Sequence, residues 1–171
     1  KQNIKKIDRA SNLDIETLKK NLMKTLVNSH LDFSKTFAKE LFLRDKKSFF
    51  EVMYSFSLMG NPKDLKLFFV YALEEIFSQI NYDENIFYTI IAYLTKFRDD
   101  YSIYMEASNI SFDVAETYSD DKKIYINIFE KVLEKYNLKN KNKFKISLHK
   151  HFEKDFTLNQ DLKNILMEKM I

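Results

Sequence analysis

The sequence predicts an all-α protein, a single globular bundle of seven to nine helices, and three observations carry that prediction. Its 171 residues include one glycine and one proline, so few positions suit the tight turns of a β-sheet. Apolar residues recur three and four positions apart along most of the chain, the spacing of one helical face. Hydrophobic residues make up 45% of the chain, enough for one domain with a buried core. We therefore expect a helical domain at residues 13–171 behind a polar tether at residues 1–12.

Three amphipathic helices are predicted before Gly60. Asp32 and Asp45 precede the second and third of them, where a carboxylate can accept hydrogen bonds from the free N–H groups of the first turn. The apolar faces of the three helices are, in order, Ile15, Leu18, Leu22 and Leu26; Phe33, Phe37 and Leu41; and Phe49, Met53 and Phe56.

The only glycine and the only proline lie two positions apart, in "SLMGNPKDLKLFF". Gly60 can take the left-handed conformation that ends one helix, and Asn61 can cap the next. Pro62 suits the first helical position, and Asp64 adds an acidic residue to the first turn. We therefore expect the sharpest corner of the chain here, with the other connections made by polar capping residues.

Two longer helices follow, and we expect them to form the core. The first, of about five turns, starts at Pro62. The second starts at Asp83 and is apolar on more than one side, extending as far as Tyr101 and Met105 in its longest form. The inward residues are expected to be Leu65, Phe69, Leu73, Ile76 and Ile80, widened by Phe68 and Ala72, in the first helix, and Phe87, Ile90, Ile91, Leu94 and Phe97 in the second.

The last third of the chain predicts further helices after a turn and loop at residues 111–121. In residues 143–152, Phe144, Ile146 and Leu148 alternate as in a strand, whereas Phe144, Leu148 and Phe152 have helical spacing; we favour the helix, since a lone strand would have no partner. The flanking helices have the faces Ile124, Ile128, Val132 and Tyr136, and Leu158, Leu162, Ile165, Leu166 and Met170, the latter after a Thr157 or Asn159 cap.

Several kinds of chemistry are excluded by composition. The chain has no cysteine, so it has no disulfide, thiolate nucleophile or Cys-ligated metal. One glycine cannot build a phosphate-binding loop, and no nucleophile elbow or zinc-protease motif is present. Its apolar runs, such as residues 67–73 and 90–94, are far shorter than the roughly 20 residues of a membrane span. We therefore predict no enzymatic activity and no cofactor.

Histidines and paired acids are the remaining candidates for a metal or acid–base site. His149 and Glu153 would share one helical face, with Asp155 or His30 needed to complete a metal site. A histidine in a lysine-rich segment is more often solvated, so we predict no metal site. Two adjacent acid pairs have the residue types of acid–base or divalent-metal sites, yet neighbours on a helix point apart, and we interpret both as solvated caps: Asp99 with Asp100, and Asp120 with Asp121.

The strongest local bias is a lysine-rich stretch interleaved with aromatic residues. Such a stretch can bind a polyanion: a nucleic acid, an anionic lipid surface or a sulfated polysaccharide. The chain has only three arginines, which argues against base reading, and a solvated connection is the plainer interpretation. The candidate binding residues, for a polyanion or a protein partner, are Lys139, Lys141, Lys143, Lys145 and Lys150.

Charge is unevenly distributed along the chain. The net charge is +6 for residues 1–63, −9 for residues 64–121 and +6 for residues 122–171. This pattern fits attraction between packed helices, and it also fits two surface fields presented to partners.

The segments "EEIFSQINYDENIFYTIIAYL" and "KKIYINIFEKVLEKYNLKNKNK" are rich in Lys, Asn, Ile and Phe. With the basic polar start and the near absence of glycine, they resemble the helical outer-surface lipoproteins of Borrelia spirochaetes in composition. The resemblance implies a lipidated cysteine and tether before Lys1, a body exposed at the outer membrane, and binding of host proteins such as complement or matrix components. No motif matches residue by residue, so it assigns no binding residue.

We therefore predict a non-enzymatic, surface-exposed lipoprotein body that binds a host or extracellular partner, with membrane contact only through a removed lipid anchor. The alternative is a cytoplasmic helical adaptor or nonspecific nucleic-acid-binding protein that uses the lysine-rich stretch. Binding that weakens steeply with salt would distinguish the alternative.

Overall fold

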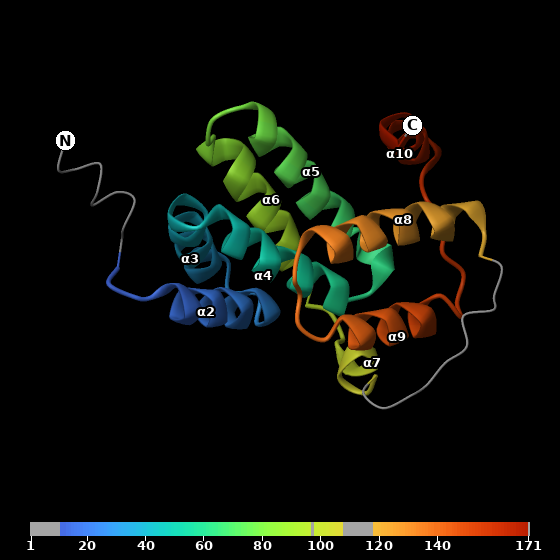
Figure 1. Ribbon diagram of the computed structural model, residues 1–171, viewed down its shortest axis with the longest axis horizontal. Helices are drawn as coiled ribbons and strands as arrows, with labels where there is room; N and C mark the ends of the chain where they lie inside the picture. The colour runs from blue at the N-terminus through green and yellow to red at the C-terminus, as the bar shows by residue number, and fades with distance from the viewer. Residues whose placement is uncertain (1–10, 97, 108–117, 171) are drawn as a thin grey trace.

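The fold is entirely helical in the residues that the computed structural model describes, which are 11–96, 98–107 and 118–170 (Figure 1). These residues form nine α-helices and one 3₁₀ turn, and they contain no strand, which confirms the all-α prediction. The α-helices are α2 (Ile15–Val27), α3 (Leu31–Arg44), α4 (Lys46–Met59), α5 (Lys66–Gln79), α6 (Glu84–Lys96), α7 (Ser102–Met105), α8 (Asp120–Lys135), α9 (Lys141–His151) and α10 (Gln160–Met170), with the 3₁₀ turn η1 (Pro62–Asp64) between α4 and α5.

Helix α4 is the centre of the core. It packs against α2, α3, α5 and α9, and it runs through the middle of the ribbon in Figure 1. The prediction that α5 and α6 form the core is confirmed only in part: their inner faces belong to it, but they make a hairpin beside α4, and each keeps one face towards solvent. Helix α4 can take the central place because apolar and small side chains cover most of its circumference, and its buried residues are Ser48, Phe49, Phe50, Val52, Met53, Tyr54, Phe56, Ser57 and Leu58.

The other helices surround α4 in pairs. Helices α2 and α3 pack together on one side, and α8 and α9 lie on the other with a groove between them, with α7 against α9 (Figure 1). Helix α10 packs on α8 at the edge of the molecule. The prediction of helix rather than strand for residues 143–152 is confirmed, since all but the last residue of that range belong to α9.

Side-chain caps start several helices, of which Asp45 and Asn159 were predicted and Asp14 was not. The carboxylates of Asp14 and Asp45 accept hydrogen bonds from the N–H groups of residues 17 and 48, at 2.7 and 3.1 Å. Asn159 rather than Thr157 caps α10, through bonds from the N–H groups of residues 161 and 162. The predicted Asp32 cap is wrong. Helix α3 starts at Leu31, with His30 in the capping position, so Asp32 lies inside its first turn.

The faces predicted for α2, α4 and α8 are confirmed, and α3 differs in part. Leu41 of α3 is buried, but the buried face runs through Ser34 and Ala38, so Phe33 is 62% exposed and Phe37 is only half-buried. The helix from Asp83 ends at Lys96, and α7 is a separate turn whose Met105 is exposed. Phe97 and residues 108–117, which include most of the loop predicted at 111–121, lie outside the described residues, and the end of that predicted loop belongs to α8.

The corner between α4 and α5 differs from the prediction in its backbone. Gly60 is extended rather than left-handed, with φ −92° and ψ −170°. The left-handed residue is Leu65, at φ 60°, which separates η1 from α5. Asn61 caps η1 as expected, since its side chain accepts a hydrogen bond from the N–H of residue 63 at 3.0 Å.

The break at Leu65 changes which side of α5 faces inward. Because α5 starts at Lys66 rather than Pro62, its orientation differs from that of a helix continuous from Pro62. Leu73 and Phe68 are buried as predicted, whereas Ala72 and Ile80 are exposed. The buried residues of α5 are Lys66, Leu67, Phe68, Val70, Leu73 and Phe77.

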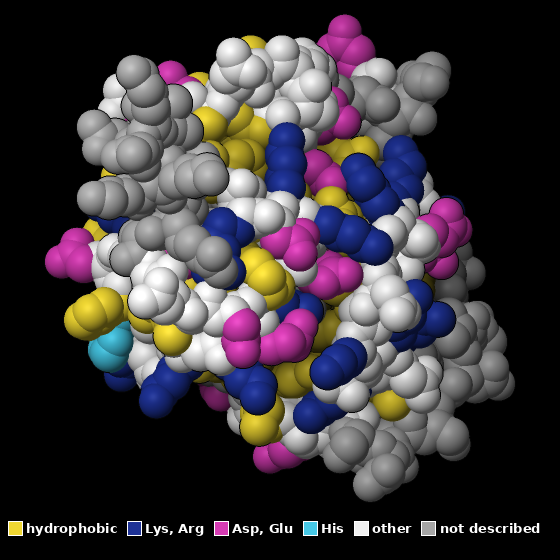
Figure 2. Space-filling model, turned by 60° about the vertical axis from the view of Figure 1, so that its left-hand side comes forward, with side chains coloured by type: hydrophobic (Ala, Val, Ile, Leu, Met, Phe, Trp, Pro, Cys, Tyr) yellow, Lys and Arg dark blue, Asp and Glu magenta, His cyan; other side chains and the backbone are white. Residues whose placement is uncertain are grey.

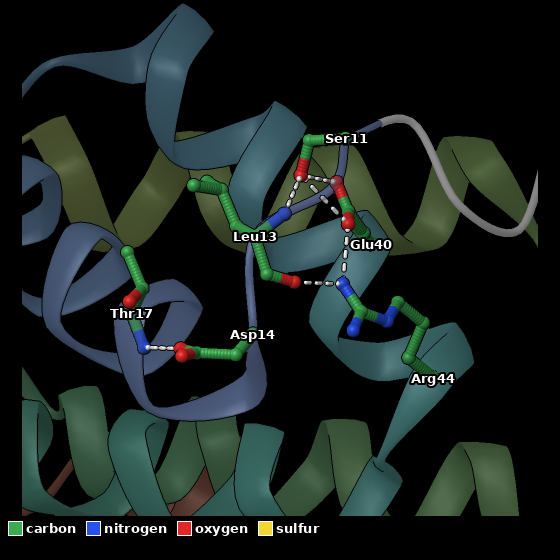
Figure 3. A network of polar contacts seen from close by, with 6 residues as sticks. All are labelled: Ser11, Leu13, Asp14, Thr17, Glu40 and Arg44. Atoms are coloured by element: carbon green, nitrogen blue, oxygen red, sulfur yellow. Dashed lines mark hydrogen bonds and ion pairs between the residues drawn. The ribbon is translucent and has the colours of Figure 1, made fainter.

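A polar network attaches the start of the described chain to α3 (Figure 3). The Ser11 hydroxyl donates to both Glu40 oxygens, at 3.0 and 2.9 Å. Arg44 Nη1 donates to Glu40 and to the Leu13 carbonyl oxygen, each at 2.7 Å. The chain is therefore fixed to the helical body from Ser11 onward, while residues 1–10 of the predicted tether lie outside the described residues.

No helix within the described ranges combines the length and the apolar character that crossing a bilayer requires.

Candidate partner-binding surface

The five predicted lysines are spread over different parts of the surface. Lys139 precedes α9 and lines a groove between α2 and α4. Lys145 lines a groove between α8 and α9, and Lys150 lines a cavity at the α4–α5 corner. Lys143 lies over the Tyr104 ring at 4.4 Å, and Lys141 is half-buried in the first turn of α9. Helical geometry separates Lys141, Lys143 and Lys145 because residues two positions apart on α9 point to nearly opposite sides of the helix.

Mixed charge is visible on one face of the molecule. Figure 2 shows Lys and Arg side chains interspersed with Asp and Glu, with apolar patches between them. Binding at one groove is therefore more consistent with this face than binding to a broad positively charged surface.

The groove between α2 and α4, which we call the α2–α4 groove, has a volume of about 410 Å³. Apolar side chains contribute part of its wall, with Met23 from α2, Val52 from α4 and Leu138 from the α8–α9 connection. The remaining lining residues are Glu16, Lys19, Lys20, Lys24, Glu51, Ser55, Asn137 and Lys139.

Helix α2 places its lysines on the groove because its opposite face is buried. Leu18, Leu22 and Leu26 are fully enclosed by the core. Lys20 and Lys24 are four positions apart, so they are neighbours on the exposed surface of α2. The leucine spacing that predicts the buried face of α2 thus also places these two lysines outside the core.

Charge pairing leaves a positive excess in the groove. Lys19 Nζ lies 3.7 Å from Glu16 and 3.4 Å from Glu51, so both groove carboxylates pair with the same lysine, and the four groove lysines outnumber the two carboxylates. Within residues 11–96, 98–107 and 118–170, Lys20, Lys24 and Lys139 make no ion pair. These three ammonium groups remain available to an acidic partner.

A second groove, about 370 Å³, lies between α8 and α9. Phe129, Leu148 and Phe152 contribute apolar surface to it, and Lys123 and Lys145 are among its polar residues. Its His149 is part of a hydrogen bond, with Nδ1 2.8 Å from the Tyr118 hydroxyl. Among the described residues, no three His, Asp or Glu side chains gather in a way that could hold a metal ion.

The corner cavity, about 250 Å³, lies beside a buried ion pair. Lys66 Nζ is 3.3 Å from Asp99, which lines the cavity together with Asp100 and His151. The interpretation of Asp99 as a solvated cap is wrong, because its side chain is only 8% exposed. Asp100 does cap, through a bond from the N–H of Ser102 at 3.0 Å.

The other acid pair also has a structural member. Asp121 is buried at the start of α8, where its carboxylate accepts the N–H of Leu158 at 2.7 Å and pairs with Lys163 at 2.8 Å. Asp120 is exposed. Asp121 therefore connects α8 to α10 rather than acting as a solvated cap.

Sequence reasoning found Lys139 but missed its companions in the α2–α4 groove. The sequence identifies Lys20 and Lys24 only as exposed residues on the polar side of an amphipathic helix. The lysines beside the leucine face of α2 could have indicated a basic surface there. No feature of the sequence near α2 indicates that residues 137–139 pack against it.

No protein-family model, no curated protein and no solved structure matches this chain. The functional argument therefore depends on the geometry of the site.

Proposed function

We propose that this chain is a non-enzymatic binding module, the helical body of a surface-exposed lipoprotein, and that it binds an acidic segment of an extracellular partner protein in the α2–α4 groove. The observation that carries the proposal is the combination of apolar wall and unpaired lysines in that groove. Exposed lysines beside apolar surface attract an amphipathic segment that carries carboxylates next to apolar side chains.

A protein partner fits the groove better than a nucleic acid or polysaccharide does. Met23 is the most exposed of the groove's apolar side chains, since Val52 and Leu138 are each 5% exposed, and it offers an apolar contact that a phosphate or sulfate backbone cannot use. Only three groove lysines are unpaired, and three phosphate contacts give a weak, strongly salt-dependent interaction. Lysine also lacks the two-pronged geometry with which arginine holds phosphate groups.

The positions of the buried ionisable groups support a binding role over catalysis. Glu40 is held by Ser11 and Arg44, and Lys66 is paired with Asp99. These groups join segments of the fold, and each is paired with a partner inside it. In this proposal, function depends on the exposed groove.

The binding test uses a fluorescent synthetic amphipathic helix with leucines on one face and glutamates beside them. We expect saturable binding that weakens at least about tenfold when Lys20, Lys24 and Lys139 are all replaced by Glu. The matched control replaces three exposed lysines outside the groove: Lys47, Lys131 and Lys154.

Equal loss of binding in the groove variant and the matched control would contradict the proposal, because general charge would then explain the affinity. Heparin and duplex DNA are measured in parallel. Tighter binding of either polyanion than of the acidic helix, through the same lysines, would favour the nucleic-acid or polysaccharide alternative.

Localisation is tested separately on cells that make the full-length protein. The proposal predicts a precursor whose signal peptide ends in a lipidated cysteine, and cleavage of the protein by protease added to intact cells. A plain cytosolic start, or complete protection from protease, would contradict surface exposure.

A further inference from the structure

A buried ion pair between Lys66 and Asp99 lies beneath the α4–α5 corner, next to a second aspartate, Asp64. Lys66 Nζ lies 3.3 Å from Oδ2 of Asp99, and the side chains of these two residues are 1% and 8% exposed. The Asp64 carboxyl lies within hydrogen-bonding reach of Asp99. The cluster therefore carries a net negative charge when both carboxyls are ionised, and it is neutral when one of them is protonated.

Asp99 also holds the backbone of the corner. Its Oδ2 accepts a hydrogen bond from the N–H of Asn61 at 3.2 Å, and its carboxylate lies against Gly60. Asp99 belongs to the connection between α6 and α7, whereas Gly60 and Asn61 connect α4 to η1. This one side chain thus joins two connections that are distant in the sequence.

The proton affinity of Asp64 is set by this cluster. Burial, followed by the hydrogen bond and the charge of Asp99, raises the pKa of Asp64 to about 6, from an ordinary 3.8. Lys66 opposes the rise through its positive charge. Near neutral pH the two carboxylates repel each other, and below pH 6 a protonated Asp64 can donate a hydrogen bond to Asp99.

We propose that Asp64 is a proton-operated latch: proton uptake at Asp64 tightens the hold of Asp99 on the α4–α5 corner, and proton loss loosens it. The sign follows from linkage. Because the pKa of Asp64 is raised in the closed corner, its contribution to closure is complete in acid and is lost as the pH rises through about 6.

The pH dependence that other groups around the cluster contribute must be distinguished from that of Asp64. Burial lowers the pKa of His151, so its contribution has the opposite sign and weakens the α9 end as the pH falls below 6.5. The tyrosine hydroxyls titrate well above this range, since burial raises their pKa values. The titratable and charged groups near Asp64 and Asp99 are Lys63 from η1, Lys66 from α5, Tyr93 from α6, Asp100 and Tyr101 from the α6–α7 connection, Tyr125 from α8, Lys150 and His151 from α9, and Lys154 and Asp155 after α9.

The N–H of Asn61 reports the latch directly, because Asp99 accepts its hydrogen bond. We measure its hydrogen exchange by NMR and correct for the pH dependence of chemical exchange. The protection of the Asn61 N–H from exchange should be about fivefold to tenfold higher at pH 5.0 than at pH 7.5. This rise is smaller than the full pKa shift would give, because solvent screens the charge of the partly exposed Asp64. The Asp64→Asn variant should lose this rise, and Asp99→Asn should have low protection at both pH values.

The His151→Gln variant should keep the rise, because it removes only the opposing contribution. Protection that is unchanged in the wild type, or a rise that persists in Asp64→Asn, would overturn the proposal. A ¹³C NMR titration of the wild-type protein is a test that does not depend on whether any variant folds. The carboxyl carbon of Asp64 should titrate near pH 6. Titration near pH 3.8 would also overturn the proposal.

Discussion

The Asp99 carboxylate occupies the space where a Cβ atom on residue 60 would stand. Gly60 is therefore required for close approach rather than for a left-handed turn, since its φ of −92° suits any residue. The contact brings the connection after α6 against the end of α4, so the single glycine of the chain lies where two distant segments meet.

Replacing Gly60 by Ala should destabilise the fold by about 2 kcal/mol, because the added methyl group displaces Asp99 from Asn61 and Lys66. Urea unfolding followed by circular dichroism measures this cost. Adding Asp99→Ala should remove most of the penalty, which makes the two changes strongly non-additive. A neutral Gly60→Ala variant would contradict the predicted crowding.

A second prediction concerns Glu74, which joins three helices. The Tyr54 hydroxyl donates to Glu74 at 2.6 Å, and the Tyr136 hydroxyl donates to its other oxygen. Burial, followed by interactions with Glu74, raises the pKa of both tyrosines, so they remain donors at neutral pH. Tyr136→Phe should therefore cost about 1–2 kcal/mol in thermal unfolding.

Tyr88→Phe is the matched control, since the Tyr88 hydroxyl makes no hydrogen bond within the part of the chain that the structure describes. It should change stability by less than about 0.5 kcal/mol. Equal effects of the Tyr136 and Tyr88 changes would argue against a contribution from Glu74.

The third prediction tests the network in Figure 3. Glu40 is 2% exposed and matches the charge of Arg44, so Glu40→Ala should cost about 3–5 kcal/mol by leaving that guanidinium unpaired. Ser11→Ala removes only a neutral donor and should cost about 1 kcal/mol. Denaturant unfolding compares the two variants, and a milder effect at Glu40 than at Ser11 would be the contrary outcome.

The fourth prediction concerns acid. Hydrogen bonding to Lys163 and to the Leu158 N–H lowers the pKa of Asp121 below its ordinary 3.8. A carboxyl whose folded pKa is lowered contributes stability above the unfolded value and loses it as the pH falls through the folded value. We therefore expect α10 to detach from α8 below about pH 4, visible as rising hydrogen exchange at residues 160–168.

The Asp121→Asn variant should have weakened α10 attachment already at pH 7, and it should add little further loss in acid. Attachment of α10 that is independent of both pH and this change would show that Leu158, Leu162 and Leu166 hold the helix by packing alone.

Local signals predicted most of the helices but not how they assemble. The faces of α2, α4 and α8 were predictable because burial follows helical periodicity directly. The orientation of α5 was not, because Leu65 takes a left-handed conformation that leucine seldom adopts, and the helix restarts at Lys66.

Sites that depend on distant partners were also beyond sequence reasoning. A lysine is expected to be exposed unless a buried partner is known. The pairing of Lys66 with Asp99 therefore could not be predicted from the sequence. The α2–α4 groove has the same origin, since Lys139 meets Lys20 and Lys24 only after α4 and α9 have packed together.

The central claim is that the α2–α4 groove binds an acidic amphipathic segment, and NMR mapping tests it most directly. Titrating the unlabelled acidic helix into the ¹⁵N-labelled protein should shift the amide signals of Met23, Val52 and Leu138 together, with a shared dissociation constant. Shifts confined to the α8–α9 groove, or spread evenly over the exposed lysines, would contradict it.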